Sequence, residues 1–271
     1  MRELMVRDAI REALDEEMAR DNTVFQMGED IGVIGGNFKC TVGLRDKYGD
    51  LRVKDTPISE QGFVGMGVGA APDRPAPGGG ADVRRLHDGL RRPALQPDGQ
   101  DHLHVPAASA TCPWWCACPW VADAPPRLST PSPSMPGPPT SPASRWWSPP
   151  PPASAKGLLK TAIRDNDPVM FFEHKMLYTT KFNDVPEVEE DVCIPFGRAR
   201  IVAEGADITV VTNSMMTIKA EKAVRQLQKE GISAELIDLR TIVPLDTETI
   251  IRSVKKTGKL LIVDEGHLSF G

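Results

Sequence analysis

The chain has 271 residues, a formal net charge of −5 and 25% charged residues, and this length corresponds to about two domains. The slightly acidic balance argues against an electrostatic nucleic-acid binder, which needs a basic face. No apolar run reaches the roughly 18 residues of a membrane span, and five cysteines do not make a disulfide scaffold. The N-terminus resembles neither a secretory nor a transit peptide, so we expect a cytoplasmic protein.

Residues 72–152 differ in composition from both flanks. They hold 20 of the 25 prolines and all five tryptophans, and they contain no Ile, Phe, Tyr, Lys, Glu or Asn. The codons of Ile, Phe, Tyr, Lys and Asn are AT-rich, whereas those of the abundant Pro, Arg, Ala and Gly are GC-rich. Disordered linkers are usually enriched in Glu and Lys. The composition therefore favours GC-rich coding DNA translated out of frame; a proline-rich linker is the alternative.

The genetic code provides a test of the out-of-frame interpretation. Tryptophan has the single codon TGG, so Trp114–Trp115 and Trp146–Trp147 are both encoded by TGGTGG. Shifted back by one base, each pair gives a valine preceded by Val, Leu or Met. With plausible codons, Cys112–Val121 becomes Pro-Val-Val-Val-Arg-Met-Pro-Met-Gly-Gly, and Ser144–Pro152 becomes Lys-Val-Val-Val-Pro-Ser-Thr-Pro. Both sequences are typical of buried strands that end in turns.

The N-terminal flank begins with an amphipathic helix pattern over Val6–Arg20, in which apolar residues recur at helical spacing. A short apolar run, Thr23–Met27, follows and is broken by Gly28-Glu29-Asp30. Residues 62–71 are small and apolar, which suits a helix packed closely against another backbone.

The C-terminal flank alternates between strand and helix patterns. We predict strands over Ile208–Thr212, Ala234–Leu239 and Leu260–Asp264, and helices over Ile218–Lys229 and Asp246–Lys256. This alternation indicates an α/β fold with right-handed crossovers and a parallel sheet. Ligands of such sheets bind at the carboxyl ends of strands, which here are Thr212–Ser214, Asp238 and Asp264–Glu265. A sheet ending at Gly271 would leave an apolar face exposed, so we expect the natural protein to continue.

Four motifs occur in order along the flanks: GEDIG at Gly28–Gly32, DTPISEQGF at Asp55–Phe63, AIRDNDPV at Ala162–Val169 and DLRTIVPLD at Asp238–Asp246. Together they resemble the β subunit of the thiamine-diphosphate-dependent decarboxylating component of 2-oxo-acid dehydrogenase complexes. Pyruvate, acetoin and branched-chain versions share the pattern. The resemblance covers both flanks but not the middle, and the two reframed sequences also look like this family at the corresponding places.

The resemblance implies a transketolase-like α/β fold in two parts. Residues 1–185 would form a pyrimidine-binding domain with a parallel sheet, in which 72–152 is out of frame and disordered or misfolded. Residues 197–271 would form the start of a transketolase C-terminal domain, truncated relative to the family.

The resemblance also implies an activity and a set of partners. The chain would be the β subunit of an α2β2 heterotetramer that decarboxylates a 2-oxo acid, with pyruvate as the first choice, and passes the acyl unit to a lipoyl acyltransferase core. Thiamine diphosphate would be shared with the α subunit, whose side holds Mg²⁺. In agreement, this sequence contains no Gly-Asp-Gly…Asn-Asn diphosphate motif.

By resemblance, Glu60 is the catalytic carboxyl. A carboxyl group beside N1′ of the aminopyrimidine favours the imino tautomer, whose 4′ nitrogen takes the C2 proton, and apolar neighbours such as Ile58 and Phe63 raise the pKa of such a group. A helix-capping acid after Ser59 is the alternative reading of Glu60. Glu29 and Ile58 would also contact the cofactor, although Glu29 fits a solvated turn equally well.

Ala162, Ile163, Asp165 and Asp167 match a loop that holds a monovalent cation, K⁺, in some family members, mostly through backbone carbonyls. A plain helix-end turn before Pro168 fits the same residues. The Cys and His residues at 102–118 fit no common zinc spacing.

With 72–152 as written, we expect little or no activity, because the loss of central strands exceeds the ~5–15 kcal/mol that stabilise a domain. The alternative function is a non-catalytic protein whose Pro/Trp-rich segment 72–152 binds partners.

Overall fold

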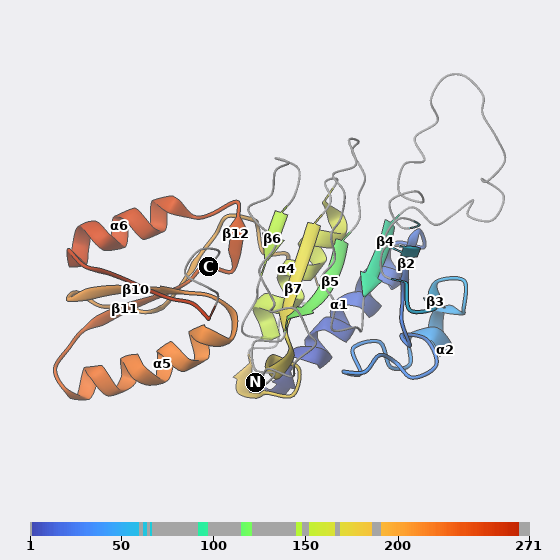
Figure 1. Cartoon of the computed structure of the whole chain (residues 1–271), viewed down its shortest axis with the longest axis horizontal. Coiled ribbons are helices and arrows are strands. Elements are labelled where there is room, and N and C mark those ends of the chain that lie inside the picture. The colour runs from blue at the N-terminus through green and yellow to red at the C-terminus, as the bar shows by residue number, and fades with distance from the viewer. Residues whose placement is uncertain are drawn as a thin grey trace, which may run out of the picture.

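The computed structural model describes residues 2–59, 62–63, 66, 92–96, 115–120, 145–147, 152–165, 169–185 and 191–265. These residues form two adjacent α/β units, one around a seven-stranded sheet and one around a four-stranded sheet (Figure 1). A separate antiparallel pair joins β1 (Arg2–Met5) to β8 (Lys181–Val185). No helix in the described part of the chain is both long and apolar enough to span a membrane. The α/β fold class expected from the sequence is confirmed.

The larger sheet has the strand order β12-β6-β7-β5-β4-β2-β3, and all its strands are parallel except β12. Its strands are β2 (Val24–Gly28), β3 (Val53–Asp55), β4 (Arg92–Gln96), β5 (Trp115–Trp120), β6 (Arg145–Trp147), β7 (Val169–His174) and β12 (Thr241–Val243). Three of them, β4, β5 and β6, lie within 72–152, and β5 and β6 fall where the restored reading frame predicts strands. In these three strands only the backbone is described.

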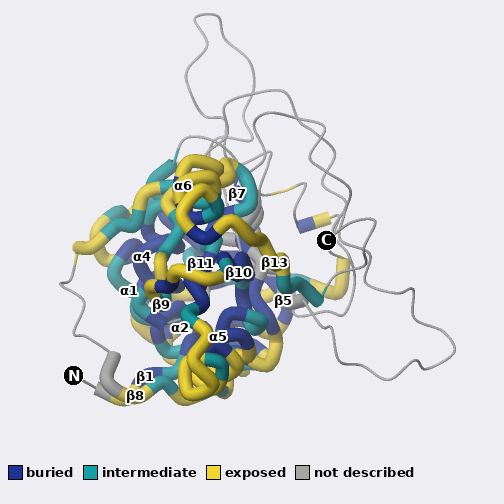
Figure 2. Tube along the Cα trace, turned by 90° about the vertical axis from the view of Figure 1, so that its left-hand side faces the viewer, coloured by how far each residue is buried: buried dark blue, intermediate teal, exposed yellow. Residues whose placement is uncertain are grey.

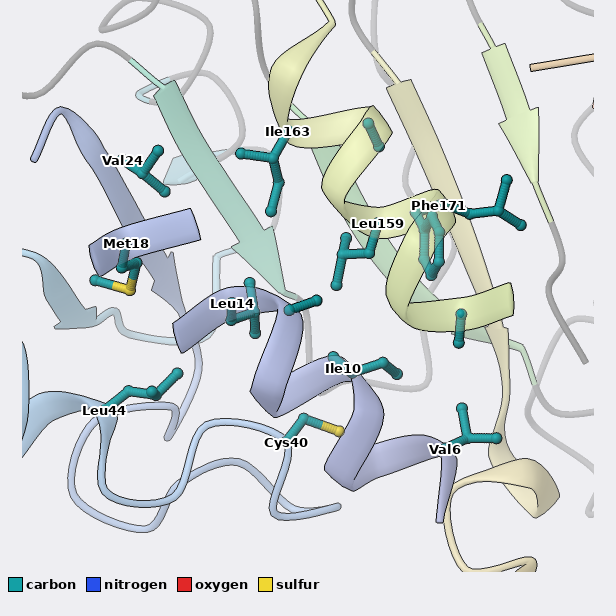
Figure 3. Close-up of a cluster of buried hydrophobic side chains, with 14 of the residues drawn as sticks. Val6, Ile10, Leu14, Met18, Val24, Cys40, Leu44, Leu159, Ile163 and Phe171 are labelled. Atoms are coloured by element: carbon teal, nitrogen blue, oxygen red, sulfur yellow. The ribbon is translucent and has the colours of Figure 1, made fainter. Parts of the chain in front are cut away.

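The core of this unit lies between the sheet and two helices, α1 (Val6–Arg20) and α4 (Pro152–Arg164). A short helix, α2 (Leu44–Tyr48), closes one side through Leu44. On α1 the buried residues Ile10, Leu14 and Met18 follow one another at four-residue spacing, and they pack in one cluster with residues of α4 and β7 (Figure 3). Each such side chain contributes about 1.5–3 kcal/mol when buried. The predicted bounds of α1 are confirmed.

A row of ion pairs runs along the same two helices. The Lys156 amine lies 2.5 Å from a Glu16 carboxylate oxygen, and the Lys160 amine lies 2.8 Å from the other oxygen. One turn further, Arg164 donates from Nε and Nη2 to the two oxygens of Glu17, at 3.0 and 2.6 Å. Because residues later in α4 pair with residues later in α1, the two helices run parallel. The side chains of Lys160 and Glu17 are almost completely buried.

The C-terminal unit has the strand order β13-β10-β11-β9, in which only β9 is antiparallel to its neighbour. Its elements are β9 (Arg200–Ala203), β10 (Ile208–Thr212), α5 (Ser214–Lys229), β11 (Ala234–Asp238), α6 (Thr247–Thr257) and β13 (Leu260–Val263). The two helices cover opposite faces of the sheet (Figure 1), and both carry exposed residues on their outer sides (Figure 2).

The structure corrects several predicted details of this unit. α5 begins at Ser214 rather than Ile218, because Met215 and Ile218 pack against the core of the N-terminal unit and stabilise an additional helical turn. α6 begins one residue later than predicted, because Asp246 is its N-cap and accepts the Thr249 N–H at 3.0 Å. β11 and β13 each end one residue earlier.

The linker between the two units, of which residues 191–199 are described, is bound at two points. Ile194 donates its N–H to the Gly157 carbonyl and accepts the Thr161 hydroxyl, both on α4, at 3.2 and 2.8 Å. Where the linker meets the C-terminal unit, the Ala199 N–H donates to the Asp246 carboxylate at 2.9 Å. In addition, β12 pairs with β6 of the larger sheet. The linker and the shared sheet therefore fix how the units sit against each other.

We predict that Glu17→Gln lowers the free energy of unfolding by about 1–3 kcal/mol, because Glu17 is buried and accepts charge-assisted hydrogen bonds from Arg164. The matched control is Lys47→Ala, which removes an ion pair whose lysine is 53% exposed and should cost less than about 1 kcal/mol. Urea unfolding followed by far-UV circular dichroism measures both. Equal losses in the two variants would show that the buried row adds nothing.

Candidate functional site

The first part of the site is the carboxyl edge of the larger sheet, where β2 and β3 end side by side. Glu29 directly follows β2 and is buried, with 6% of its surface exposed. The Thr56 N–H donates to the Gly28 carbonyl at 2.9 Å, which brings the segment after β3 next to Glu29. Ile58, two residues further on, is 83% exposed. The structure therefore places two of the predicted cofactor residues, Glu29 and Ile58, on neighbouring strand ends.

The loop that follows Glu29 is held by the carboxylate of Asp55. Its Oδ1 accepts the Gly32 N–H at 2.6 Å, and its Oδ2 accepts the Val33 N–H at 3.2 Å and a donor of Arg45 at 3.3 Å. A Cβ on Gly32 would lie 2.7 Å from Asp55 Oδ2, so any larger residue would push the Asp55 carboxylate out of its present position. The loop presents Val33 and Ile34 to solvent, 78% and 48% exposed. These two residues and Ile58, which we call the apolar rim, border the edge at which Glu29 lies.

Glu60, the predicted catalytic carboxyl, lies outside the described residues. On either side of it, the Ser59 carbonyl accepts the N–H groups of Gly62 and Phe63 at 2.8 and 3.1 Å. Phe63 is 1% exposed. The motif residues next to Glu60 thus begin a helical segment, to which Gly62, Phe63 and Met66 belong, after β3 and at the same sheet edge as Glu29. The catalytic and the helix-capping readings of Glu60 both stay predictions.

The predicted cation loop begins in the last turn of α4. Ala162 and Ile163 are buried there, and the Asp165 N–H donates to the Thr161 carbonyl at 2.9 Å, which closes the helix. Asp167 lies outside the described residues. Within the described ranges no group of three or more His, Cys, Asp or Glu could hold a metal ion, but a site made of backbone carbonyls is of a different kind. The structure brings Ala162, Ile163 and Asp165 together, and the cation itself stays a prediction.

A second polar edge lies at the carboxyl ends of the strands in the smaller sheet. The Asn213 side chain donates to Asp264 at 2.8 Å, which joins the ends of β10 and β13. Glu265 lies 3.1 Å from the Nε2 atom of the buried His174, at the end of β7 in the larger sheet. Asp238, at the end of β11, is fully buried. The strand ends singled out in the sequence do lie at one edge.

Asp238 has an unusual electrostatic environment. Its Oδ1 accepts the Arg240 N–H at 3.1 Å, and its Oδ2 lies 3.5 Å from Arg200 Nε. Burial raises the pKa of Asp238 to about 6, although Arg200 and the Arg240 N–H act in the opposite direction. Sequence reasoning missed both arginines as members of a site. Arg200 begins an antiparallel strand that strand–helix alternation does not reveal, and Arg240 lies in the DLRTIVPLD motif, whose signal in the sequence is the family resemblance.

Comparisons with known proteins identify both units. Residues 2–77 match the transketolase pyrimidine-binding domain, and residues 197–271 match the transketolase C-terminal domain. The mitochondrial pyruvate dehydrogenase E1 component subunit beta of Dictyostelium discoideum is 39% identical over 100% of this chain and 76% of its own length. The Rickettsia felis pyruvate dehydrogenase E1 component subunit beta is 40% identical over 99% of this chain and 81% of its own.

One further relative and one solved structure also match this chain. The 2-oxoisovalerate dehydrogenase subunit beta of Bacillus subtilis is 39% identical over 95% of this chain and 78% of its own length. Among solved structures, a split-gene transketolase described as an inactive β4 tetramer superimposes with a TM-score of 0.67 at 18% identity, over 99% of this chain and 81% of that one. This structural likeness confirms the transketolase-like fold.

We predict that Asp55→Asn loosens the loop after Glu29, because an amide cannot accept all the donors that the carboxylate binds. A loss of about 1.4 kcal/mol corresponds to roughly tenfold faster amide hydrogen exchange at Gly32 and Val33. Asp46→Asn, at an exposed position on α2, is the control. Unchanged exchange in Asp55→Asn would mean that the loop is held by its other contacts.

A further prediction concerns pH. Because the folded-state pKa of Asp238 is raised to about 6, the folded state binds more protons than the unfolded state between about pH 4 and 6. Stability therefore falls as pH rises through this window, by up to about 3 kcal/mol. Asp238→Asn should remove that component. The measurement is the difference between wild-type and variant unfolding free energies from pH 4 to pH 7; a flat difference would contradict it.

Proposed function

Because this chain belongs to the family of β subunits of the pyruvate and 2-oxo-acid dehydrogenase E1 component, we propose that it contributes half of a thiamine-diphosphate site that decarboxylates a 2-oxo acid, with pyruvate as the first candidate. The relatives from Dictyostelium and Rickettsia support pyruvate, and the Bacillus relative supports the wider substrate class. The family favours this function over a non-catalytic role for 72–152. The structural observation that carries it is that the buried Glu29 and the exposed Ile58 follow two neighbouring parallel strands at one sheet edge.

The residues at this edge fit the aminopyrimidine part of the cofactor. Exposed aliphatic side chains, Ile58 and Val33, offer an apolar surface to a planar ring, and the buried Glu29 supplies a carboxyl group beside it. When bound, thiamine diphosphate supplies the carbanion and the electron sink for decarboxylation. By the family resemblance, Glu60 would hold a proton shared with ring N1′ when the cofactor is bound. The hydrogen bonds that Asp55 accepts keep the loop after Glu29 in one conformation, which orients the Glu29 carboxyl group without further reorganisation.

The other half of the site comes from an α subunit. This sequence lacks a diphosphate-binding motif, and relatives carry the word "subunit" in their names, which supports an α2β2 assembly with Mg²⁺ on the α side. A lipoyl acyltransferase core accepts the acyl unit. K⁺ binds at Ala162–Asp167, where the end of a helix provides backbone carbonyls. The cytoplasmic location expected from the sequence stays a prediction.

The segment 72–152 is translated out of frame in this proposal. The two family matches end at residue 77 and resume at residue 197, and the interval between them contains most of this segment. The natural subunit then carries valine-rich strands in place of the Pro- and Trp-rich sequence. The chain as written has little or no activity.

Resequencing the coding DNA from codon 60 to codon 160 tests the reading frame. If single-base insertions or deletions disappear, the corrected chain should decarboxylate pyruvate when it is co-expressed with its α subunit. If the DNA encodes the printed protein, the gene is a broken copy or has its own use for the segment. A corrected chain that remains inactive with its α subunit would overturn the assignment of activity.

We predict that Glu60→Gln in the frame-corrected subunit lowers kcat by about 100-fold or more, since proton transfer by a positioned group contributes 10²–10⁴. Cofactor affinity should change much less, because the amide keeps the shape of the side chain. Decarboxylation with an artificial electron acceptor gives kcat, and fluorescence titration gives the affinity. Glu230→Gln, at an exposed position after α5, is the control. A loss of less than tenfold would support the helix-capping reading of Glu60.

A further inference from the structure

The interface between α5 and its sheet is apolar along most of its length and polar at one end. Val210 and Leu236 of the sheet pack against Ala220 and Val224 of α5. Side chains alternate along a strand, so the residues two positions further, Thr212 and Asp238, lie on the same face. On the helix, Ser214 and Thr217 precede Ala220 at three-residue spacing and share its inward face. The polar residues therefore meet at the carboxyl edge.

Two arginines complete this group. Thr212 and Asp238 are direct partners in the parallel ladder, and the Leu239 N–H donates to the Thr212 carbonyl at 2.9 Å. On the other side of β11, Arg200 of β9 is the ladder partner of Asp238. Arg240 follows Asp238 by two residues in the chain. We call these six residues the α5 polar cluster: Arg200, Thr212, Ser214, Thr217, Asp238 and Arg240.

Each member of the α5 polar cluster has a buried polar atom without a hydrogen-bond partner among the described residues. These atoms are Thr212 Oγ1, Ser214 Oγ, Thr217 Oγ1, Asp238 Oδ2, Arg200 Nε and Arg240 Nε. The three hydroxyl residues and Asp238 are at most 2% exposed. One such atom costs about 1–3 kcal/mol, and native proteins contain only a few per 100 residues. Two of these atoms, Asp238 Oδ2 and Arg200 Nε, lie 3.5 Å apart as an ion pair without a hydrogen bond between them. A ligand that bonds to the whole cluster would satisfy all six atoms together.

The N-terminus of α5 adds to the donors of this cluster. α5 has 16 residues, and Asn213, its N-cap residue, makes no side-chain cap because its amide donates to Asp264. The first turn thus presents N–H groups and the positive end of the helix dipole. Ser214 has φ +49°, a strained value for a residue other than glycine. Helix N-termini of this kind bind oxyanions.

The composition of the cluster selects among oxyanions. Two guanidinium groups, three hydroxyls and a helix end provide more donors than the single carboxylate provides acceptors, which favours an anion. Asp238 Oδ2 faces Arg200 Nε at 3.5 Å but accepts no hydrogen bond among the described residues, so it can accept one from the ligand. Monohydrogen phosphate has one P–OH group and three other oxygens, whereas sulfate and the dianion of a phosphomonoester have no O–H.

We propose that the α5 polar cluster binds inorganic phosphate, with Asp238 accepting a hydrogen bond from the P–OH group and Arg200, Arg240 and the hydroxyls donating to the other oxygens. The site belongs to the C-terminal unit and is independent of the proposed thiamine site. It distinguishes phosphate from sulfate by the proton on the ligand rather than by charge or size.

Isothermal titration calorimetry on the full 271-residue chain tests the proposal at about pH 7.5 and constant ionic strength, with phosphate, sulfate and methyl phosphate as probes. We expect binding of phosphate and at least about tenfold weaker binding of the other two. Binding of methyl phosphate as tight as that of phosphate would assign the site to phosphomonoesters and overturn the role of the P–OH group. The absence of phosphate binding, or equal binding of sulfate, would overturn the proposal.

Variants separate the roles within the cluster. Asp238→Asn replaces an acceptor by a group that can also donate, so sulfate binding should appear and the preference for phosphate should disappear. Arg240→Gln should weaken phosphate binding by about tenfold or more. Arg225→Gln on α5, whose side chain is 74% exposed and pairs with Glu221, is the charge-matched control and should bind phosphate as the wild type does. Equal losses in both arginine variants would indicate a non-specific charge effect.

A pH series gives a readout that does not depend on any variant. Below about pH 6 Asp238 becomes protonated, since burial raises its pKa to about 6, and its O–H can then donate to sulfate. The other charged groups at the cluster are the guanidinium groups of Arg200 and Arg240, and Asp264, which accepts from Asn213. Sulfate binding should therefore appear as pH falls from 7.5 to 5. Sulfate binding that stays absent across this range would contradict the role of Asp238.

Discussion

The parallel pairing of α1 with α4 is the contact on which the rest of the structure depends. These helices come from opposite flanks of the segment 72–152, and every described strand of the larger sheet except β7 and β12 lies between them in the chain. Their apolar faces meet over the sheet, and beside them Lys156, Lys160 and Arg164 bind the acidic residues of α1. Much of this charge is buried, so it contributes less to net stability than to fixing the register of the two helices.

The same helix pair also determines where the C-terminal unit lies. Arg164 reaches from Glu17 to Asp191 at the start of the linker, and Thr161 binds the linker at Ile194. From there the linker reaches the N-cap of α6. The position of the smaller sheet thus follows from contacts made on α4. The carboxyl edges of the two sheets are connected directly where His174 approaches Glu265.

The sequence predicts those features that depend on local periodicity. The bounds of α1 and, apart from β12, the order of the strands and helices from Ile208 onwards follow from apolar spacing alone. The antiparallel strands β9 and β12 could not be predicted, because their pairing depends on tertiary partners and they are short. For the same reason Arg200 was not recognised as a neighbour of Asp238. Glu29 and Ile58 were found through family motifs, whereas the exposed Val33 and Ile34 have no signal in sequence beyond their place in a glycine-rich loop.

The linker has a consequence for how sequences of this fold can vary. Between Ile194 and Ala199 both ends are bound, one to α4 and one to Asp246, and Gly197 adopts φ +68° with Pro244 close to it. A segment fixed at both ends spans a set distance, so it tolerates neither insertion nor deletion. The turn at Gly231, which has open space around it, carries no such restriction. Length variation among relatives should therefore accumulate after α5 and be absent from the linker. The fixed length of this short segment thus sets the distance between the two units.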